Sequence, residues 1–422
     1  MGRCCRKHVK PHFQEEQTYK LKILMINIVC GVKSTGRICT DLADELTNQG
    51  HKVKIAYGRE NVPEKYQKYA VRIGNDLDIY THAFKSRIFD SVGLSSKWYT
   101  EQFINWVIKY DPDVIHMHNL HGYYINIEVL FNYLRTCGKR IIWTLHDCWA
   151  FTGHCFYFDF VNCYRWETGC HDCPKKTDYP KSFVFDRSRQ NYGLKKRLFN
   201  HIPNLTIVTP SEWLAELVKR SYLKDYPVTV IHNGIDTDVF KPTPSDLREK
   251  LGIGDKKVVL GIASVWEPRK GLPDLLELNR RLRTFTESAD SEAQAYQMVL
   301  IGINDMQRKK MRVSDDIITI PRTDSQKELA QYYTMADVYV TPTYEENYPT
   351  ANLEAIACGT LVITYDTGGS GESARMYGAV VERGNLKALL DSVLASSKLK
   401  TCDFDIGMPF FLKQYTDLYL AR

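Results

Sequence analysis

The sequence lacks long apolar runs. No stretch of about 18 or more apolar residues occurs, so no membrane-spanning helix is expected. Residues 1–20 are polar, contain two cysteines and lack the apolar core of a secretory signal, and we expect them to form a disordered lead. Together these absences predict a cytoplasmic protein.

Common nucleotide and nucleic-acid signatures are also missing. The first glycine loop contains neither G-x-G-x-x-G nor G-x-x-x-x-G-K-[ST], so neither a dinucleotide site nor a P-loop is supported. No RNA- or DNA-binding signature occurs, and nucleic acid is not an expected partner. The net charge of +6 is mild and suits anionic substrates or a negatively charged membrane leaflet, without requiring either.

The chain is long enough for two domains. It has 422 residues, of which 44% are hydrophobic and 25% charged, as in soluble globular proteins. Residues 21–29 form a β-type run, residues 30–37 a glycine-containing loop, and Ile38, Leu42 and Leu46 recur at helical spacing. This order is typical of the opening of a doubly wound α/β domain. The loop either covers an acceptor or phosphate or is a plain tight turn.

A second alternation of strands and helices begins after a proline-rich hinge at residues 241–245. We therefore predict an N-terminal domain over residues 21–235, which includes a cysteine-rich insertion at residues 148–175. We predict a C-terminal domain over residues 236–405. Residues 406–422 are expected to form a final helix that can pack back on the first domain.

Polar side chains follow several predicted strands, where open α/β folds bind ligands. His146 follows the strand at residues 140–145; a structural histidine that bonds a backbone group is an equal alternative. Arg269 and Lys270 follow the strand at residues 257–263 and could clamp a diphosphate. Gly368 and Gly369 follow a later strand and could form an anion-binding nest.

Residues 344–354, Y-E-E-N-Y-P-T-A-N-L-E, join a buried strand to a helix that begins near Pro349. Glu346 then lies in the loop and Glu354 in the helix, and both can face the crevice. Glu354 can accept hydrogen bonds from hydroxyls, while the helix N-terminus offers N–H groups to an anion. By spacing alone, two glutamates eight residues apart are more often solvated charges.

Five of the twelve cysteines fall between Cys148 and Cys173. Cys155, Cys163, Cys170 and Cys173 end in a C-x-x-C pair, which indicates a structural zinc site that would hold the insertion together. An iron–sulfur cluster or independently buried cysteines are alternatives. A reducing compartment argues against disulfides.

The basic and aromatic stretch at residues 175–197 allows three interpretations. It could meet an anionic lipid surface, bind a phosphorylated acceptor, or form a solvated helix face.

Four blocks together resemble a known family. They are residues 21–37, residues 232–236 (H-N-G-I-D), residues 267–271 (E-P-R-K-G) and residues 346–359. They are similar to the family-4 retaining glycosyltransferases, two-domain enzymes of the GT-B fold. The resemblance spans residues 21–420 and implies an α/β protein with two Rossmann-like domains facing each other across a cleft. The cysteine-rich insertion and residues 116–122 resemble the bacterial polysaccharide-biosynthesis subgroup related to colanic acid enzymes.

The resemblance implies roles for the second-domain residues. Glu354 would hold the ribose of a nucleotide-sugar donor. Glu346 would contact hydroxyls of the transferred sugar, helped by loop N–H groups around Asn347 and Tyr348. Lys270 would neutralise the leaving diphosphate.

The first domain would bind the acceptor. His146 would lie beside the reaction centre, and the loop from Gly31 to Gly36 would cover the diphosphate. The chain departs from many relatives at Ser264, where they have an arginine on the diphosphate. The GT-B fold requires no D-x-D metal motif, so a catalytic metal is not implied; zinc would be structural only.

The sequence thus predicts a hexosyltransferase that moves a sugar from a nucleotide-sugar donor to a growing glycan or lipid-linked saccharide. Its peripheral contact would be with the inner face of the membrane. The alternatives are a non-catalytic nucleotide-sugar-binding subunit, which Ser264 keeps open, and a nucleotide-sugar epimerase or phosphorylase on the same fold.

Overall fold

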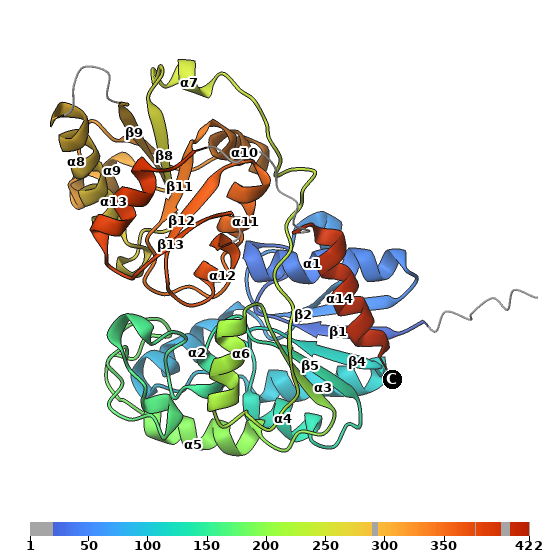
Figure 1. Ribbon diagram of the computed structural model, residues 1–422. Coiled ribbons are helices and arrows are strands. Elements are labelled where there is room, and N and C mark those ends of the chain that lie inside the picture. Colours follow the sequence, from blue (N-terminus) through green and yellow to red (C-terminus); the bar gives the residue numbers. More distant parts are fainter. Residues whose placement is uncertain (1–19, 289–293, 376, 398–405, 422) are drawn as a thin grey trace, which may run out of the picture.

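The computed structural model describes residues 20–288, 294–375, 377–397 and 406–421. The predicted lead at residues 1–20 therefore lies, except for its last residue, outside the described residues. Two wholly parallel β-sheets, each covered by helices, form two domains (Figure 1). The α/β class with two Rossmann-like domains is confirmed.

The first sheet has seven strands in the order β3-β2-β1-β4-β5-β6-β7. They are β1 (Lys22–Ile26), β2 (Lys52–Tyr57), β3 (Ala70–Arg72), β4 (Val114–Met117), β5 (Arg140–Thr144), β6 (Leu205–Thr209) and β7 (Val228–Val230). The main helices of this half are α1 (Lys33–Asn48), α2 (Asp76–Phe89), α3 (Lys97–Tyr110), α4 (Ile127–Leu134), α5 (Ser188–Phe199) and α6 (Glu212–Arg220).

The alternation of side chains along β1 divides the first core into two layers. Leu24 and Ile26 pack with α3 and α4 on one face of the sheet, and Ile23 and Met25 pack with α1 on the other. Because both faces are covered, the strand is a continuous apolar run, which is why it was recognisable in the sequence.

The second sheet has six strands in the order β10-β9-β8-β11-β12-β13. They are β8 (Lys257–Ile262), β9 (Tyr296–Ile301), β10 (Ile318–Ile320), β11 (Val338–Thr341), β12 (Leu361–Tyr365) and β13 (Gly378–Val381). The helices are α7 (Leu247–Lys250), α8 (Leu272–Ser288), α9 (Asp305–Met311), α10 (Gln326–Met335), α11 (Thr350–Ala357), α12 (Ser370–Ala374) and α13 (Leu386–Leu394).

The last helix, α14 (Met408–Leu420), returns to the first domain and lies beside α1 (Figure 1). Tyr415 and Tyr419 are buried in the same core layer as α1. The Tyr419 hydroxyl lies 2.6 Å from Nδ1 of His116 on β4. The chain thus passes between the domains twice, and Ile235 and Gly407 pair where the two passages meet.

Two local features differ from the sequence-based expectation. Helix α1 begins at Lys33, so Gly36 lies in its first turns and not in a loop. Helix α2 was not predicted, because its apolar residues do not gather on one buried face: Leu77 is exposed while Ile79 is buried.

The cysteine-rich insertion forms three short 3₁₀ turns, η2 (Trp149–Phe151), η3 (Asp159–Val161) and η4 (Arg165–Glu167), joined by loops. Among the described helices, none combines the length and apolar character needed to cross a bilayer.

Candidate active site

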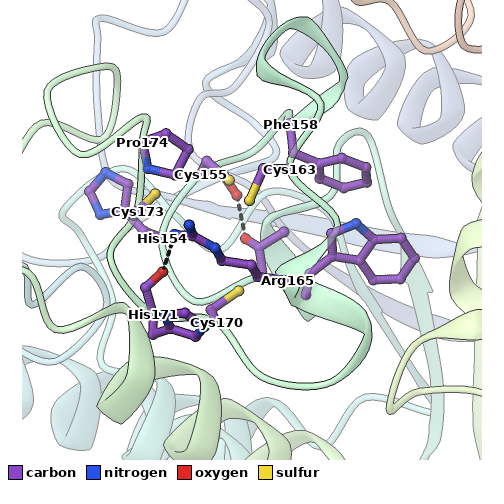
Figure 2. Close-up of a pocket in the computed structure, with 11 residues that line it drawn as sticks. His154, Cys155, Phe158, Cys163, Arg165, Cys170, His171, Cys173 and Pro174 are labelled. Carbon is purple, nitrogen blue, oxygen red and sulfur yellow. Dashed lines mark hydrogen bonds between the residues drawn. The ribbon is translucent and has the colours of Figure 1, made fainter.

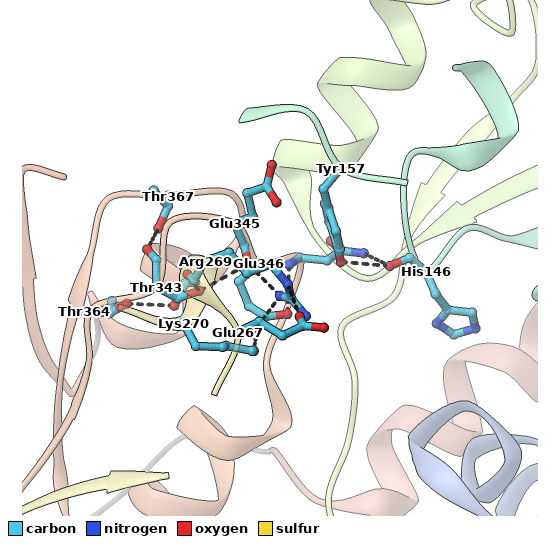
Figure 3. A network of polar contacts seen from close by, with 12 residues as sticks. His146, Tyr157, Glu267, Arg269, Lys270, Thr343, Glu345, Glu346, Thr364 and Thr367 are labelled. Carbon is cyan, nitrogen blue, oxygen red and sulfur yellow. Dashed lines mark hydrogen bonds and ion pairs between the residues drawn. The ribbon is translucent and has the colours of Figure 1, made fainter. Parts of the chain in front are cut away.

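Lys270 and Glu346 meet at the carboxyl edge of the second sheet (Figure 3). Lys270 ends the turn η5 (Pro268–Lys270) after β8, and Glu346 lies in the loop after β11. Because β8 and β11 are adjacent parallel strands, their ends share one edge of the sheet. Nζ of Lys270 bonds Oε2 of Glu346, and Nη1 of Arg269 lies 3.9 Å from the same oxygen.

Two cations therefore face one buried carboxylate. Burial opposes ionisation of Glu346, but Lys270 and Arg269 outweigh it and hold the pKa of the carboxyl below its ordinary value. Arg269 also donates to the carbonyl of Glu345 at 3.1 Å, and its guanidinium lies 5.7 Å from the Tyr157 ring centre. The Glu346 carboxylate is thus ionised and already charge-balanced at neutral pH.

The glycines after β12 support the Glu346 loop from behind. A side chain on Gly368 would come within 1.7 Å of the Glu346 carbonyl oxygen, and the N–H of Gly369 donates to that oxygen at 3.3 Å. Glycine is needed here for close approach of two backbones. The N–H of Gly369 is already used inside the protein, and an anion-binding role of this pair stays a prediction.

The side chains of Asn347 and Tyr348 join the two domains. Asn347 accepts a hydrogen bond from Oγ of Ser211 at 2.5 Å and donates to the carbonyl of His146 at 3.0 Å. The ring of Tyr348 stacks on His232, with centroids 4.6 Å apart. The donor contact predicted for these residues stays a prediction; their side chains bond the loop that carries Glu346 to the N-terminal domain.

His146 is at the end of β5, as predicted, but its ring points away from Lys270 and Glu346 (Figure 3). Nε2 of His146 lies 3.0 Å from Nδ1 of His118. Burial lowers the pKa of His146 to about 4, although Asp147 opposes the shift. The ring is therefore neutral at pH 7, and its role at the reaction centre stays a prediction.

Glu354 faces a separate cavity of about 300 Å³ that both domains line. Its carboxylate accepts a hydrogen bond from the Tyr333 hydroxyl at 3.1 Å. Burial raises the pKa of Glu354, while Tyr333 and Arg37 oppose the shift. No side chain caps the N-terminus of α11 a turn earlier, which leaves its first N–H groups to a ligand or water.

The first domain contributes the opposite wall of this cavity. Gly31 lines it, as does Arg37 from α1, whereas Gly36 packs against Val29 instead. The wall also contains Ser34, from the predicted loop, and residues that sequence reasoning did not single out: Asp41, Lys65 and Tyr66. Burial raises the pKa of Asp41 to about 6. No motif marks these positions, because they meet Glu354 only through the packing of the two domains.

A second cavity, of about 420 Å³, lies between the cysteine-rich insertion and the Arg269 loop. Its lining is aromatic and carries charges of both signs: Phe156, Tyr157, Phe160 and Tyr179, the basic Lys175, Lys181 and Arg269, and the acidic Asp178, Glu267 and Glu345. Glu345 at its edge is fully buried. Its carboxylate is 2.8 Å from Nζ of Lys175 and accepts the N–H of Phe160 at 2.7 Å. The insertion is therefore bonded to the second domain beside the Lys270–Glu346 pair.

The four clustered cysteines line one small cavity with His154 (Figure 2). Cys170 Sγ accepts the N–H of Gly153 at 3.2 Å, and a hydrogen bond from Cys155 lowers the pKa of Cys173 to about 7. Within the described residues, no group of three or more His, Cys, Asp or Glu side chains is arranged to hold a metal ion. The structural zinc set of Cys155, Cys163, Cys170 and Cys173 stays a prediction from the sequence.

Two protein-family models match this chain, one over each domain. Residues 35–239 match the model described as "Glycosyltransferase Family 4", and residues 245–401 match "Glycosyl transferases group 1". The chain belongs to glycosyltransferase family 4. Both halves of the family architecture are present in order, one in each domain, as the sequence resemblance predicted.

Individual relatives match parts of the chain. "Putative colanic acid biosynthesis glycosyl transferase WcaC" of Escherichia coli (strain K12) is 28% identical over 233 residues, which cover 51% of this chain and 55% of that protein. D-inositol 3-phosphate glycosyltransferase of Arthrobacter sp. (strain FB24) is 32% identical over 179 residues, covering 41% of this chain and 42% of the relative. The chain thus matches about half the length of these family members.

Solved structures match nearly the whole chain in fold. Sucrose-phosphate synthase (tll1590) from Thermosynechococcus elongatus has a TM-score of 0.64 at 16% identity, covering 95% of this chain and 98% of its own. Anabaena Alr3699/HepE in complex with UDP and glucose has a TM-score of 0.56 at 14% identity, covering 94% and 95%. These likenesses confirm the GT-B fold of this family member.

Proposed function

We propose that the protein is a retaining glycosyltransferase that moves a hexosyl group from a nucleotide-sugar donor to a growing, lipid-linked polysaccharide. The observation that carries the proposal is the Lys270–Glu346 pair at the domain interface, with Glu354 at a second position along the same loop and helix. Family membership supports the reaction class, and the UDP and glucose named for Alr3699/HepE support a nucleotide-sugar donor.

The ion pair gives Lys270 and Glu346 complementary tasks. When a nucleoside diphosphate enters, the Lys270 ammonium can exchange the Glu346 carboxylate for a phosphate oxygen. Glu346 is then free to accept hydrogen bonds from the hydroxyls of the sugar. Arg269 lies 3.9 Å from that carboxylate. It supplies the second cation, because Ser264 stands where many relatives have an arginine. Charge that develops on the leaving diphosphate would be met by groups that are already in place.

Glu354 suits the ribose because it is a partly buried acceptor in the first turns of a helix. Its carboxylate can bond ribose hydroxyls while the free N–H groups of α11 face the phosphates. Departure of the diphosphate leaves an oxocarbenium-like sugar, which an acceptor hydroxyl attacks from the same face. Its proton passes to the departing phosphate oxygen, which lies on that face. Closure of the domains excludes water from this step.

The acceptor side rests on the first domain. The name of WcaC supports a polysaccharide product, and we infer a lipid-linked acceptor at the cytoplasmic face of the membrane. The domain roles are therefore acceptor binding for the N-terminal half and donor binding for the C-terminal half.

The test is release of nucleoside diphosphate from a panel of nucleotide sugars, with and without lipid-linked acceptor, followed by NMR of the new anomeric linkage. Lys270→Met should lower turnover about 100-fold or more, since it removes a cation from the leaving group. The exposed Lys250→Met is the matched control. An inverted anomer would refute retention. A free epimerised sugar would indicate an epimerase, and a dependence on phosphate would indicate a phosphorylase. Donor binding without turnover would indicate a non-catalytic binding subunit.

A further inference from the structure

Helix α2 presents an apolar row to solvent. Leu77, Tyr80 and Phe84 follow one another at spacings of three and four residues, which places them on one face of the helix. Their exposed fractions are 75%, 73% and 64%. The opposite face, with Ile79 and Ala83, is buried against the domain. The exposed row is therefore separate from the face that anchors the helix.

Phe89, at the end of α2 and about 140° around the helix from Phe84, meets a second segment of the chain. The ring of Phe89 stacks on Phe185, with centroids 5.7 Å apart and planes 9° apart. The N–H of Phe183 donates to the carbonyl of Arg87 at 2.7 Å, so residues 183–185 lie along the last turn of α2. Large apolar side chains are exposed on both segments. We call this set the aromatic ridge: Leu77, Tyr80, Phe84, Phe89, Phe183, Val184 and Phe185.

Basic side chains border the ridge. Lys85 and Arg87 lie on α2, and exposed basic residues stand on both sides of residues 183–185: Lys181, Arg187 and Arg189. Asp186, the one acidic residue in that segment, is turned inward and accepts the N–H groups of Cys173 and Ser188. Asp76, at the far end of α2, is paired with Arg72. The surface is thus apolar at its centre and positive at its border.

The ridge also adjoins a cavity of the candidate site. Tyr179 and Lys181 line the 420 Å³ cavity, and Phe183 follows Lys181 by two residues. A molecule held at the ridge therefore lies close to the opening beside Arg269 and Glu345.

We propose that the aromatic ridge docks the protein on a membrane that contains anionic lipid. Aromatic and aliphatic side chains with a border of Lys and Arg suit the headgroup region, where rings enter the acyl boundary and cations stay with the phosphates. The charge of the border favours this occupant over an uncharged protein surface. One further step rests on the proposed function: the cavity beside the aromatic ridge would receive a lipid-linked acceptor. The docking itself does not rest on that function.

Flotation with phosphatidylcholine vesicles, with and without about a third of phosphatidylglycerol, tests the proposal. The wild type should float with the anionic vesicles and be released by salt. The triple variant Leu77→Ser, Phe84→Ser and Phe185→Ser should bind at least about tenfold more weakly. Met306→Ser, which removes an equally exposed apolar side chain from α9, should bind as the wild type does. Thermal melts check that the exposed substitutions leave the fold intact.

The proposal is overturned if the wild type ignores anionic vesicles, or if the triple variant binds them as well as the wild type. It is also overturned if light scattering shows that the ridge forms a dimer that the triple variant loses and that does not bind vesicles. Nucleoside diphosphate release without vesicles is measured on the same samples. Vesicle binding without any turnover would refute the proposed function and leave the docking surface standing.

Discussion

The ionised carboxyl of Glu354 lowers the stability of the folded protein. Because burial raises its pKa above the unfolded value, ionised Glu354 opposes folding at every pH above that value, and the opposition disappears as the pH falls below it. Glu354→Gln keeps an oxygen for the Tyr333 hydroxyl and removes the charge.

We expect Glu354→Gln to raise the free energy of unfolding at pH 8 by about 0.5–2 kcal/mol, with no gain near pH 4, while donor affinity falls. Urea denaturation at the two pH values and titration with nucleotide sugar measure the two effects. Glu287→Gln on α8, whose carboxylate is exposed, is the control. Normal donor affinity in Glu354→Gln would show that Glu354 is not part of the donor site.

At the scale of elements, β4 and β5 bring three histidines together. His116, His118 and His146 lie on or just after these strands, and burial lowers the pKa of each, that of His116 to about 3 and of His146 to about 4. The unfolded chain therefore binds more protons than the folded one below pH 6.5. Stability is fully present above that value and falls as the pH drops toward the folded pKa values.

Each histidine should contribute up to about 1.4 kcal/mol per pH unit to this loss between pH 6 and 4.5. His118→Asn should make the pH dependence of the unfolding free energy shallower by about that slope, as measured by denaturant titration. An unchanged slope in His118→Asn would show that the ring is already protonated in the folded protein.

Ser211 caps the N-terminus of helix α6 and also bonds the other domain. Its Oγ accepts the N–H of Leu214 as the helix cap and donates to Asn347 in the other domain. Ser325 caps α10 in the same way, by accepting the N–H of Glu328.

Ser211→Ala and Ser325→Ala should each lower stability by about 1 kcal/mol, the cost of a lost cap. Only Ser211→Ala should also raise the KM for donor, because it loosens the loop that carries Glu346. Steady-state kinetics with both variants separates the two contributions. Equal KM values in both would show that the interdomain bond does not position the donor loop.

At the scale of the whole molecule, the Lys175–Glu345 pair ties the insertion to the second domain. Both side chains are buried, with 9% and 0% of their surface exposed. Among the described residues, removing Lys175 leaves the Glu345 carboxylate buried with only the Phe160 N–H bonded to it, whereas removing Glu345 leaves Lys175 with Asp178 at 3.7 Å.

Lys175→Met should lower the free energy of unfolding by about 3–5 kcal/mol, and Glu345→Gln should lower it less because Asp178 stays near Lys175. The double variant should cost clearly less than the sum of the two. A double-mutant cycle by denaturant titration measures this coupling. The exposed pair of Lys413 and Asp417 gives the reference, where we expect about 0.5 kcal/mol or less. Additive costs in the buried pair would mean that water reaches it and that the domains separate there.

Much of the fold could be predicted because its signals are local. The run at β1 and the strand–loop–helix order around Glu346 follow from neighbouring residues, and the pairing of β8 with β11 then brings Lys270 to Glu346. The contacts of Glu345 with Lys175 could not be predicted, since they join residues 170 positions apart and no sequence pattern pairs the two. The orientation of the His146 ring depends on His118 of the neighbouring strand, which the order of residues does not reveal.

The return of α14 to the first domain has a consequence for the making of the protein on the ribosome. The core layer around α1 contains Phe411, Leu412, Tyr415 and Tyr419, so the first domain synthesised cannot finish folding until residues 408–420 have emerged. Until then, Nδ1 of His116 lacks the Tyr419 hydroxyl, and only part of the core on the α1 side of the sheet is covered. The complete second domain must be synthesised in that interval, which makes the nascent first half a natural client for chaperones.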